Sequence, residues 1–392
     1  MSAFRRSSLG SVVRQFAFSV LALHLGGCIF MPAKAPDAPP VAVAPTGPDP
    51  SAPRLKALET RRFALRSADQ EVIGETQVLF ARHENTFSAI GRQYNLGYEE
   101  MRSANPGVDQ WLPGEGTPIY LPTATLLPDA PRSGIVINVP AMRLFYYTSA
   151  KSPTDPAHEQ LSVTSHPIGI GAEGWATPFG EAKVTQKARD PVWYVPASVR
   201  KEHADRGDPL PRVVQPGPDN PLGEFAMALS IPGYLIHGTN KPAGVGMRSS
   251  HGCIRLYPED IEELFERVAK GTTVRMVNQP VLAGWRDGQL FLEVHPPLAE
   301  EQHDLFAEAN TALNRALERA GDAAAAVQID PAAVRTIVTG QRGIPLPVLR
   351  GSRSLEQYLA AARIVENTVP ASRAEQAARV SESTTDAVVS GR

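Results

Sequence analysis

The 392-residue chain contains only two cysteines, Cys28 and Cys253. Two cysteines form at most one disulfide. We expect each cysteine to have a separate role rather than to be paired with the other.

The chain also lacks an excess of charge and a long apolar run. Its net charge of −2 provides no basic field, so nothing in it indicates nucleic-acid binding. The apolar run from Phe16 to Leu25 is too short to span a bilayer comfortably. A hydrophobic content of 42% and a charged content of 20% are typical of a soluble protein, and the length allows two or three domains.

The N-terminus has the pattern of a secretory signal, which we assign to residues 1–27. Arginines precede the apolar run, and Leu25-Gly26-Gly27-Cys28 follows it. These four residues resemble the bacterial lipoprotein box, in which a peptidase cuts before the cysteine and the cysteine is diacylated. The resemblance implies lipid on Cys28 and a periplasmic protein, anchored to the outer membrane because Ile29 follows. The alternative is an ordinary signal peptide with a chance cysteine.

Proline, in contrast, is abundant, with 36 residues, many of them between Pro32 and Pro53. A Pro- and Ala-rich stretch without a hydrophobic period predicts an extended, disordered tether, which we assign to residues 28–73. The last segment, 367–392, is rich in Ser, Thr, Ala and Glu and is also predicted to be disordered.

Residues 74–123 are predicted to form a small α+β unit with the order strand, helix, helix, strand. Its turns contain Asn105-Pro106-Gly107 and Trp111-Leu112-Pro113-Gly114. This order and these turns resemble a LysM domain, a family that binds the N-acetylglucosamine-containing glycan of peptidoglycan. The usual Gly-Asp-Thr of that family is replaced by residues 83–86, His-Glu-Asn-Thr, so a degenerate unit kept as a spacer is the alternative.

Residues 133–278 are predicted to be mainly β, because short apolar runs alternate with turn residues. One helix is expected from Pro258, since proline fits a first turn and Glu259 and Asp260 then lie near its positive end. The remaining stretch, 279–366, is predicted to be a largely helical extension that begins with a hairpin at Asp287-Gly288.

The chemistry-bearing residues gather between Tyr234 and Asp260. Two motifs stand out there: His237-Gly238-Thr239 and Ser250-His251-Gly252-Cys253-Ile254-Arg255. A thiolate that attacks and an imidazole that moves the proton are what nucleophilic acyl transfer requires. Two histidines and one cysteine also form a partial zinc set, but the chain lacks a second cysteine for a closed structural site. We therefore predict no metal.

The two motifs closely resemble those of the L,D-transpeptidase (YkuD/ErfK) family, which are His-Gly and then Ser-(His/Asn)-Gly-Cys-(Ile/Val)-Arg. Thr177-Pro178-x-Gly180 resembles a further piece of the same domain. The resemblance implies a YkuD-type β-sandwich or barrel with one or two short helices. It also implies Cys253 as nucleophile, His237 as proton donor and acceptor, and no cofactor.

Further residues receive roles from the same resemblance. His251 is expected to tune Cys253 or orient the acyl chain, and the backbone N–H groups of Gly252 and Cys253 to form an oxyanion hole. Four residues are predicted to lie around the substrate: Arg255, Ser250, Gly238 and Thr239. Arg255 is expected to hold a carboxylate, and Ser250 to shape the turn. Gly238 is expected because a larger side chain there would crowd the imidazole. Purely structural roles are the alternatives.

The implied substrate is the stem peptide of peptidoglycan, whose fourth residue is D-alanine. Cys253 would attack the carbonyl that joins the third residue to that D-alanine, and an amine would resolve the thioester. The amine could belong to another stem peptide, to a lysine of an outer-membrane lipoprotein or to a free D-amino acid. Water as acceptor would give a hydrolase that releases wall-bound lipoprotein, and a silent fold would leave a non-catalytic wall-binding lipoprotein.

Overall fold

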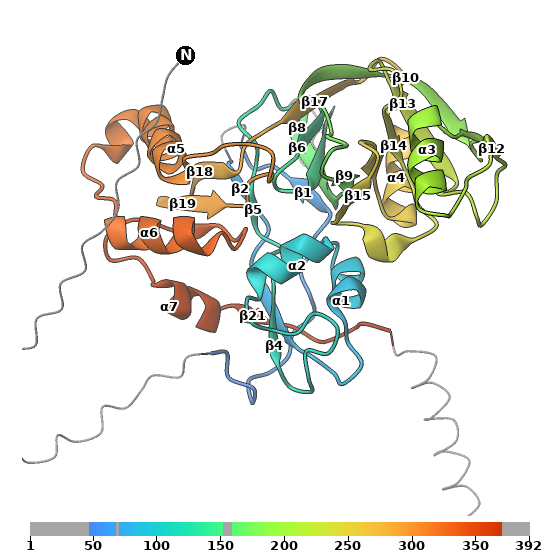
Figure 1. The fold of residues 1–392 in the computed structure, drawn as a ribbon. Helices are drawn as coiled ribbons and strands as arrows, with labels where there is room; N and C mark the ends of the chain where they lie inside the picture. Colours follow the sequence, from blue (N-terminus) through green and yellow to red (C-terminus); the bar gives the residue numbers. More distant parts are fainter. Residues whose placement is uncertain (1–46, 68–69, 152–158, 371–392) are drawn as a thin grey trace, which may run out of the picture. The chain divides into compact units, whose positions relative to one another are not determined.

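A large, mostly antiparallel sheet organises the computed structural model, which describes residues 47–67, 70–151 and 159–370 (Figure 1). In spatial order its nine strands are β1 (Arg62–Ala64), β8 (Glu159–Pro167), β7 (Arg143–Lys151), β6 (Gly134–Asn138), β17 (Thr273–Val277), β10 (Gly180–Arg189), β13 (Phe225–Leu229), β14 (Leu235–His237) and β16 (Ile254–Arg255). Two neighbouring pairs, β6–β17 and β14–β16, are parallel. The prediction of a mainly β catalytic region is confirmed.

One face of this sheet is covered by α4 (Pro258–Arg267), the predicted helix. Pro258 occupies its first turn, where the missing N–H costs nothing. Ile261 and Leu264 are fully buried and join a core that includes Ile236 and Ile254 from the sheet. Burial of each such side chain stabilises the fold by about 1.5–3 kcal/mol. The two isoleucines also define which face of β14 and β16 is the core face.

Several short elements surround the β14–β16 end of the sheet. One of them, β11 (Trp193–Tyr194), lies in a short apolar run, 192–195, of the kind that predicts a strand. The sequence pattern did not predict the others as separate elements. They are β9 (Ile170–Gly171), α3 (Ala197–Asp205), β12 (Val213–Val214), a 3₁₀ turn (Pro242–Gly244) and β15 (Arg248–Ser250). Only Val199 of α3 is buried, so that helix has almost no apolar periodicity.

The N-terminal unit (residues 77–121) has the predicted order β3 (Gln77–Phe80), α1 (Phe87–Gln93), α2 (Tyr98–Ala104) and β4 (Pro118–Leu121). The side chain of Thr86 caps α1 by accepting a hydrogen bond from the backbone N–H of Ala89. A third strand, β21 (Arg363–Ile364), pairs in parallel with β3. Residues far along the chain therefore complete the sheet of this unit.

The prediction of a tether through residue 73 is wrong for its last part. Strand β1 joins the large sheet beside β8, and β2 (Val72–Ile73) pairs with β5 (Thr125–Leu126). Leu65, Val72 and Ile73 are buried. Their burial offsets the cost of ordering the backbone, although the segment is too short to show a hydrophobic period.

The predicted disordered tail also begins too early. Val369 is buried in the core of the N-terminal unit, and the Asn367 amide donates to the Phe80 carbonyl over 2.9 Å. Residues 371–392 lie outside the described residues, as does Cys28.

The C-terminal extension contains a small sheet as well as helices. Its elements are β18 (Val281–Arg286), β19 (Gln289–Val294), α5 (Leu305–Ala320), a 3₁₀ turn (Gly321–Ala324), α6 (Pro331–Gly340), β20 (Leu346–Pro347) and α7 (Leu355–Ala360). The predicted hairpin turn has positive φ at Asp287 and Gly288. Helix α5 packs on β18, and α6 packs on β19 (Figure 1). Helix α5 begins where Asp304 caps the N–H of Ala307.

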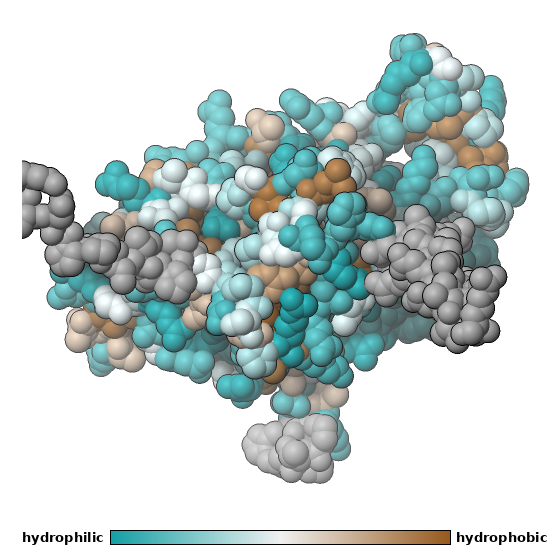
Figure 2. All heavy atoms as spheres, turned by 90° about the horizontal axis from the view of Figure 1, so that it is seen from below, coloured by the Kyte–Doolittle hydropathy of each residue, from teal (hydrophilic) through white to brown (hydrophobic). Residues whose placement is uncertain are grey.

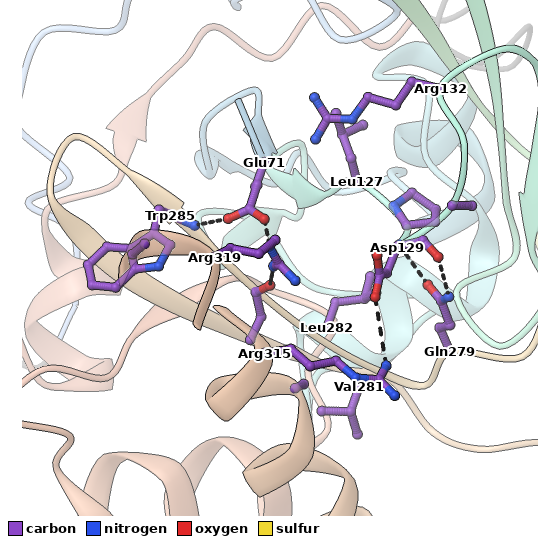
Figure 3. Close-up of a pocket in the computed structure, with 15 residues that line it drawn as sticks. Glu71, Leu127, Asp129, Arg132, Gln279, Val281, Leu282, Trp285, Arg315 and Arg319 are labelled. Atoms are coloured by element: carbon purple, nitrogen blue, oxygen red, sulfur yellow. Dashed lines mark hydrogen bonds and ion pairs between the residues drawn. The ribbon is translucent and has the colours of Figure 1, made fainter. Parts of the chain in front are cut away.

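A pocket of about 480 Å³ lies where the extension meets the segment before β6 (Figure 3). Its acidic side chains are paired within the pocket. Oε2 of Glu71 accepts a hydrogen bond from the Trp285 backbone N–H at a distance of 2.6 Å. Oε1 of Glu71 forms an ion pair with Nη2 of Arg319, also at 2.6 Å. Asp129 lies 3.7 Å from Arg315. This mutual pairing indicates that the pocket is a joint between segments of the chain rather than a reaction site.

The face in Figure 2 is mostly hydrophilic, with apolar side chains in separate patches. In residues 47–67, 70–151 and 159–370, the exposed large apolar residues are Leu55, Trp111, Leu112, Phe179, Tyr194, Val213 and Phe306. Among the described residues, no helix combines the length and the apolar character that a membrane span requires.

The return of the chain to β3 gives a first testable expectation. Val365 is fully buried beside β21, so Val365→Ala leaves a cavity in the N-terminal unit. We expect the free energy of unfolding to fall by about 2 kcal/mol. Val213→Ala removes the same atoms from a side chain that is 37% exposed and serves as the matched control. Chemical denaturation of both variants measures the difference, and equal stability would contradict the packing described here.

Candidate active site

The register of β14 and β16 brings the two motifs together. Ile236 pairs with Ile254, and His237 pairs with Arg255, in parallel. Side chains alternate between the faces of a strand, so His237 and Arg255 lie opposite the core face. Cys253 is two residues before Arg255 and therefore shares that face. Strand pairing thus places Cys253 and His237 as diagonal neighbours.

His237 is held as a neutral imidazole of one defined tautomer. Its side chain is buried, and Nδ1 lies 2.7 Å from the carbonyl oxygen of Gly238. A carbonyl can only accept, so Nδ1 carries the hydrogen and Nε2 keeps its lone pair. Burial, together with the nearby Arg255 charge, lowers the pKa of His237 to about 4. His237 is therefore a proton acceptor at neutral pH.

Cys253 is a free thiol at rest. Its Sγ lies 3.6 Å from the Gly233 carbonyl oxygen. Burial raises the pKa of the thiol, although a hydrogen bond from the Leu235 backbone and the Arg255 charge oppose this shift. Because His237 is also neutral, the pair does not form a resting thiolate–imidazolium. Deprotonation must accompany attack, which requires a base.

The turn before Cys253 requires glycine. Gly252 has a φ of +96°, and a Cβ there would lie 2.8 Å from Cε1 of Tyr234. Both the backbone conformation and the ring exclude a side chain. The Tyr234 ring therefore packs directly against the turn that carries Cys253.

Two hydroxyl groups fix this turn. Ser250 Oγ donates to the carbonyl of Cys253 over 2.6 Å. Thr177 Oγ1 accepts from the Gly171 N–H and donates to the Gly252 carbonyl, each over 3.0 Å. The Thr177 motif was noticed in the sequence, but its contact with the turn was not predicted.

Arg255 has hydrogen-bonding capacity to spare. Nη1 donates to Ser249 Oγ over 3.2 Å, while Nε is buried without a partner. Desolvation lowers the pKa of the guanidinium, and in the described part of the chain no carboxylate is paired with it. A buried cation with unused donors suits a carboxylate ligand, which a guanidinium can hold through two hydrogen bonds.

His251 contacts residues that the sequence did not single out. Its Nε2 lies 2.9 Å from Oε2 of Glu202 on α3. Trp175 meets the imidazole ring edge-on, with ring centroids 4.7 Å apart. Burial, followed by the charges of His203, Arg206 and Arg255, lowers the pKa of His251.

Gly238 contacts both the imidazole and α4. Its carbonyl accepts a hydrogen bond from Nδ1 of His237. A Cβ at Gly238 would also lie 3.0 Å from Cγ2 of Ile261, a contact that the sequence did not predict. The Thr239 side chain is buried and accepts from the Lys241 N–H over 2.9 Å, so it stabilises the turn after the first motif.

The loop between the motifs rests on the N-terminal unit. The N–H groups of Tyr98 and Glu99 donate to the carbonyls of Val245 and Gly246, over 3.3 and 3.1 Å. A Cβ on Gly97 would lie 2.8 Å from the Gly246 Cα, so the two backbones touch. This contact fixes the position of the loop that follows His237.

A substitution in the turn gives a second expectation. Gly252→Ala combines an unfavourable φ with the clash against Tyr234 and displaces Cys253. Since a misplacement of about 1 Å can cost roughly 10²-fold, we expect a loss of that order in turnover. Gly271→Ala is the matched control, because its φ of +88° carries the same backbone cost with no atom near the new Cβ. Similar activities of the two variants would contradict the role of the turn.

Within residues 47–67, 70–151 and 159–370, no three His, Cys, Asp or Glu side chains gather as metal ligands do. The chemistry of the described residues is that of a half-buried thiol, a neutral imidazole and a guanidinium on one face of two paired strands.

Comparison with known proteins agrees with this arrangement. Residues 132–276 match the YkuD family, described as the L,D-transpeptidase catalytic domain. The probable L,D-transpeptidase YcfS of Escherichia coli K12 is 38% identical over 294 residues, which span 74% of this chain and 88% of that protein. YbiS of the same strain, with the same description, is 40% identical over 241 residues, which span 60% and 76%. ErfK/SrfK of Salmonella typhimurium LT2, also a probable L,D-transpeptidase, is 33% identical over 302 residues, which span 75% and 93%. The chain belongs to the L,D-transpeptidase family.

Proposed function

We propose that the protein is a peptidoglycan L,D-transpeptidase in which Cys253 is the nucleophile and His237 is its base. The observation that carries this proposal is the shared face of β14 and β16. There, a thiol and an imidazole with a free Nε2 are diagonal neighbours. The donor is a stem peptide with D-alanine at its fourth position.

In the first half-reaction, Sγ attacks the carbonyl carbon that joins the third residue to D-alanine. The thiol proton passes to Nε2 of His237 as the C–S bond forms. The C–N bond then breaks, and His237 gives the proton to the departing amine. The products are a thioester on Cys253 and free D-alanine.

The turn and Arg255 would assist this step. The N–H groups of Gly252 and Cys253 are the proposed donors to the developing oxyanion, a contribution that is typically the largest in acyl transfer. Arg255 is the proposed partner of a donor carboxylate, because its unused N–H groups lie on the same face as Cys253.

In the second half-reaction, an amine attacks the thioester and releases Cys253. The acceptor would be another stem peptide, a lysine of an outer-membrane lipoprotein or a free D-amino acid. With water as acceptor, the same site would act as a hydrolase.

We also propose that the N-terminal unit is a LysM domain that holds the glycan. Trp111 is 54% exposed, and its ring centroid lies 6.0 Å from that of Tyr98. Exposed aromatic rings offer apolar faces on which sugar rings can stack. Lipidation of Cys28, an anchor in the outer membrane and a periplasmic location remain part of the proposal, on the N-terminal sequence pattern alone.

The test is the product formed from a purified disaccharide-tetrapeptide. We expect the mass of a thioester on the protein, loss of D-alanine and formation of a dimeric muropeptide. Tripeptide without dimer would favour the hydrolase. A folded protein with a free thiol that forms neither thioester nor product would favour a non-catalytic wall-binding protein.

A further inference from the structure

A carboxylate–imidazole pair lies beside the proposed nucleophile, and the acylation step described above does not use it. Glu202 accepts from Nε2 of His251 over 2.9 Å, and the two side chains are 30% and 28% exposed. Only Gly252 separates His251 from Cys253 in the chain. The pair is therefore next to the nucleophile and still open to a ligand.

The surroundings hold this pair in place. Glu202 forms an ion pair with Arg206, the residue that follows α3, and Trp175 packs edge-on against the imidazole. The ring of His203 lies 6.1 Å from that of His251. The Arg255 charge acts on the pKa values of His237, His251 and Cys253, so one guanidinium is electrostatically coupled to all three groups.

Hydrogen bonding to Glu202 also sets the tautomer of His251. A carboxylate accepts, so Nε2 carries the hydrogen and Nδ1 is left with the lone pair. In Ser-His-Asp triads a carboxylate placed in this way orients the imidazole and stabilises the imidazolium when it forms. His237, in contrast, donates from Nδ1 to a backbone carbonyl and keeps Nε2 free. The two histidines are therefore set up as two separate proton acceptors.

We propose that Glu202 is a positioning residue that prepares His251 to take the proton of the acceptor amine in the second half-reaction. This inference rests on the proposed transpeptidase function and adds a division of labour between the two histidines. His237 serves the attack of Cys253 on the donor. His251, through Glu202, serves the attack of the amine on the thioester.

The step balances as follows. The nitrogen lone pair of the neutral amine attacks the thioester carbonyl carbon, and the nitrogen loses a proton to Nδ1 of His251. The C–S bond breaks, and its electron pair leaves with Sγ. The imidazolium returns the proton to the thiolate. One thioester and one amine become one amide and one thiol.

The charge of His251 depends on four neighbouring groups. Glu202 and His203 come from α3, Arg206 directly follows that helix, and Arg255 lies in β16. Of these, Glu202 is the one anion. Replacing it by a neutral group disfavours the imidazolium. We therefore expect Glu202→Gln to change the acid limb of the pH profile of the amine-dependent rate. If the contact between Glu202 and His251 were purely structural, the substitution would leave that limb in place.

The experiment separates the two half-reactions in the full chain. Acylation of Cys253 is followed by intact mass with a carbapenem. Amine transfer is followed by formation of dimeric muropeptide from a disaccharide-tetrapeptide, in which the acceptor amine belongs to a second stem peptide and is not the D-alanine released in the first half-reaction. For Glu202→Gln we expect acylation within about twofold of wild type and dimer formation reduced by about 10–100-fold, the lower part of the range for general acid–base groups. Glu202→Asp should recover part of the dimer formation.

Asp205→Asn is the matched control, because it removes the same charge from α3 at a carboxylate that is 62% exposed and paired with Lys201. We expect it to form dimer at the wild-type rate. Wild-type dimer formation in Glu202→Gln, or equal losses of acylation and dimer formation, would overturn the inference. Absence of acylation in the wild-type protein would instead overturn the proposed function itself.

Discussion

Replacing Cys253 by alanine is expected to abolish turnover and to leave the fold unchanged. Without Sγ no thioester can form, and no other cysteine lies in the described part of the chain. The thiol lies 3.6 Å from the Gly233 carbonyl, and alanine keeps the Cβ and the backbone of the turn, so the substitution costs little packing. We therefore expect muropeptide products to fall below detection and the melting temperature to change by only a few degrees.

Cys253→Ser is the companion variant, because it keeps the size and the hydrogen-bonding group but replaces the nucleophile by a weaker one. It should fold equally well and be almost inactive. Retained activity in the alanine variant would contradict the thiol mechanism, whereas inactivity together with unfolding in both variants would show that Cys253 is needed for the fold.

The second large effect is expected at His237. The resting thiol has a raised pKa, so it needs a base, and His237→Ala removes that base. General-base groups contribute about 10²–10⁴-fold, and we expect acylation of Cys253 at pH 7 to fall by that amount. Raising the pH ionises the thiol directly, so the variant should recover part of its acylation rate in alkaline solution. Intact mass against time at several pH values measures both effects.

The wild-type pH profile tests the same argument. The pKa of His237 is lowered to about 4, so protonation removes the base only below that pH. We expect the acid limb of acylation near pH 4 rather than near the ordinary histidine value of about 6.5. His83→Ala, at an exposed histidine, is the control and should behave as wild type. An unchanged pH profile in His237→Ala would assign the base to another group.

Much of the catalytic region was predictable from residue patterns. Alternating apolar runs located the central strands, and Pro258 with its acidic neighbours located α4, because these signals arise from local backbone preferences. The two motifs located the site because Cys and His are rare and their spacing is specific. What the sequence could not give was the strand register, which depends on pairing between β14 and β16.

The elements that the sequence patterns did not predict are stabilised by contacts between residues that are far apart in the chain. Strand β1 has three residues and β21 has two, and each is defined by its partner strand rather than by a period of its own. Helix α3 is polar, and its functional contact, Glu202 with His251, joins positions 49 residues apart. Such a contact leaves no local pattern. The approach of Ile261 to Gly238 was not predicted either, because the position of Ile261 follows from the packing of α4.

The central claim is that Cys253 is an acylated nucleophile, and the most direct measurement is the intact mass of the protein after exposure to a carbapenem, followed by peptide mapping. The account predicts a single covalent adduct, located on Cys253, that is absent from Cys253→Ala and slow to form in His237→Ala. An adduct on another residue, or no adduct on a folded protein with a free thiol, would contradict it.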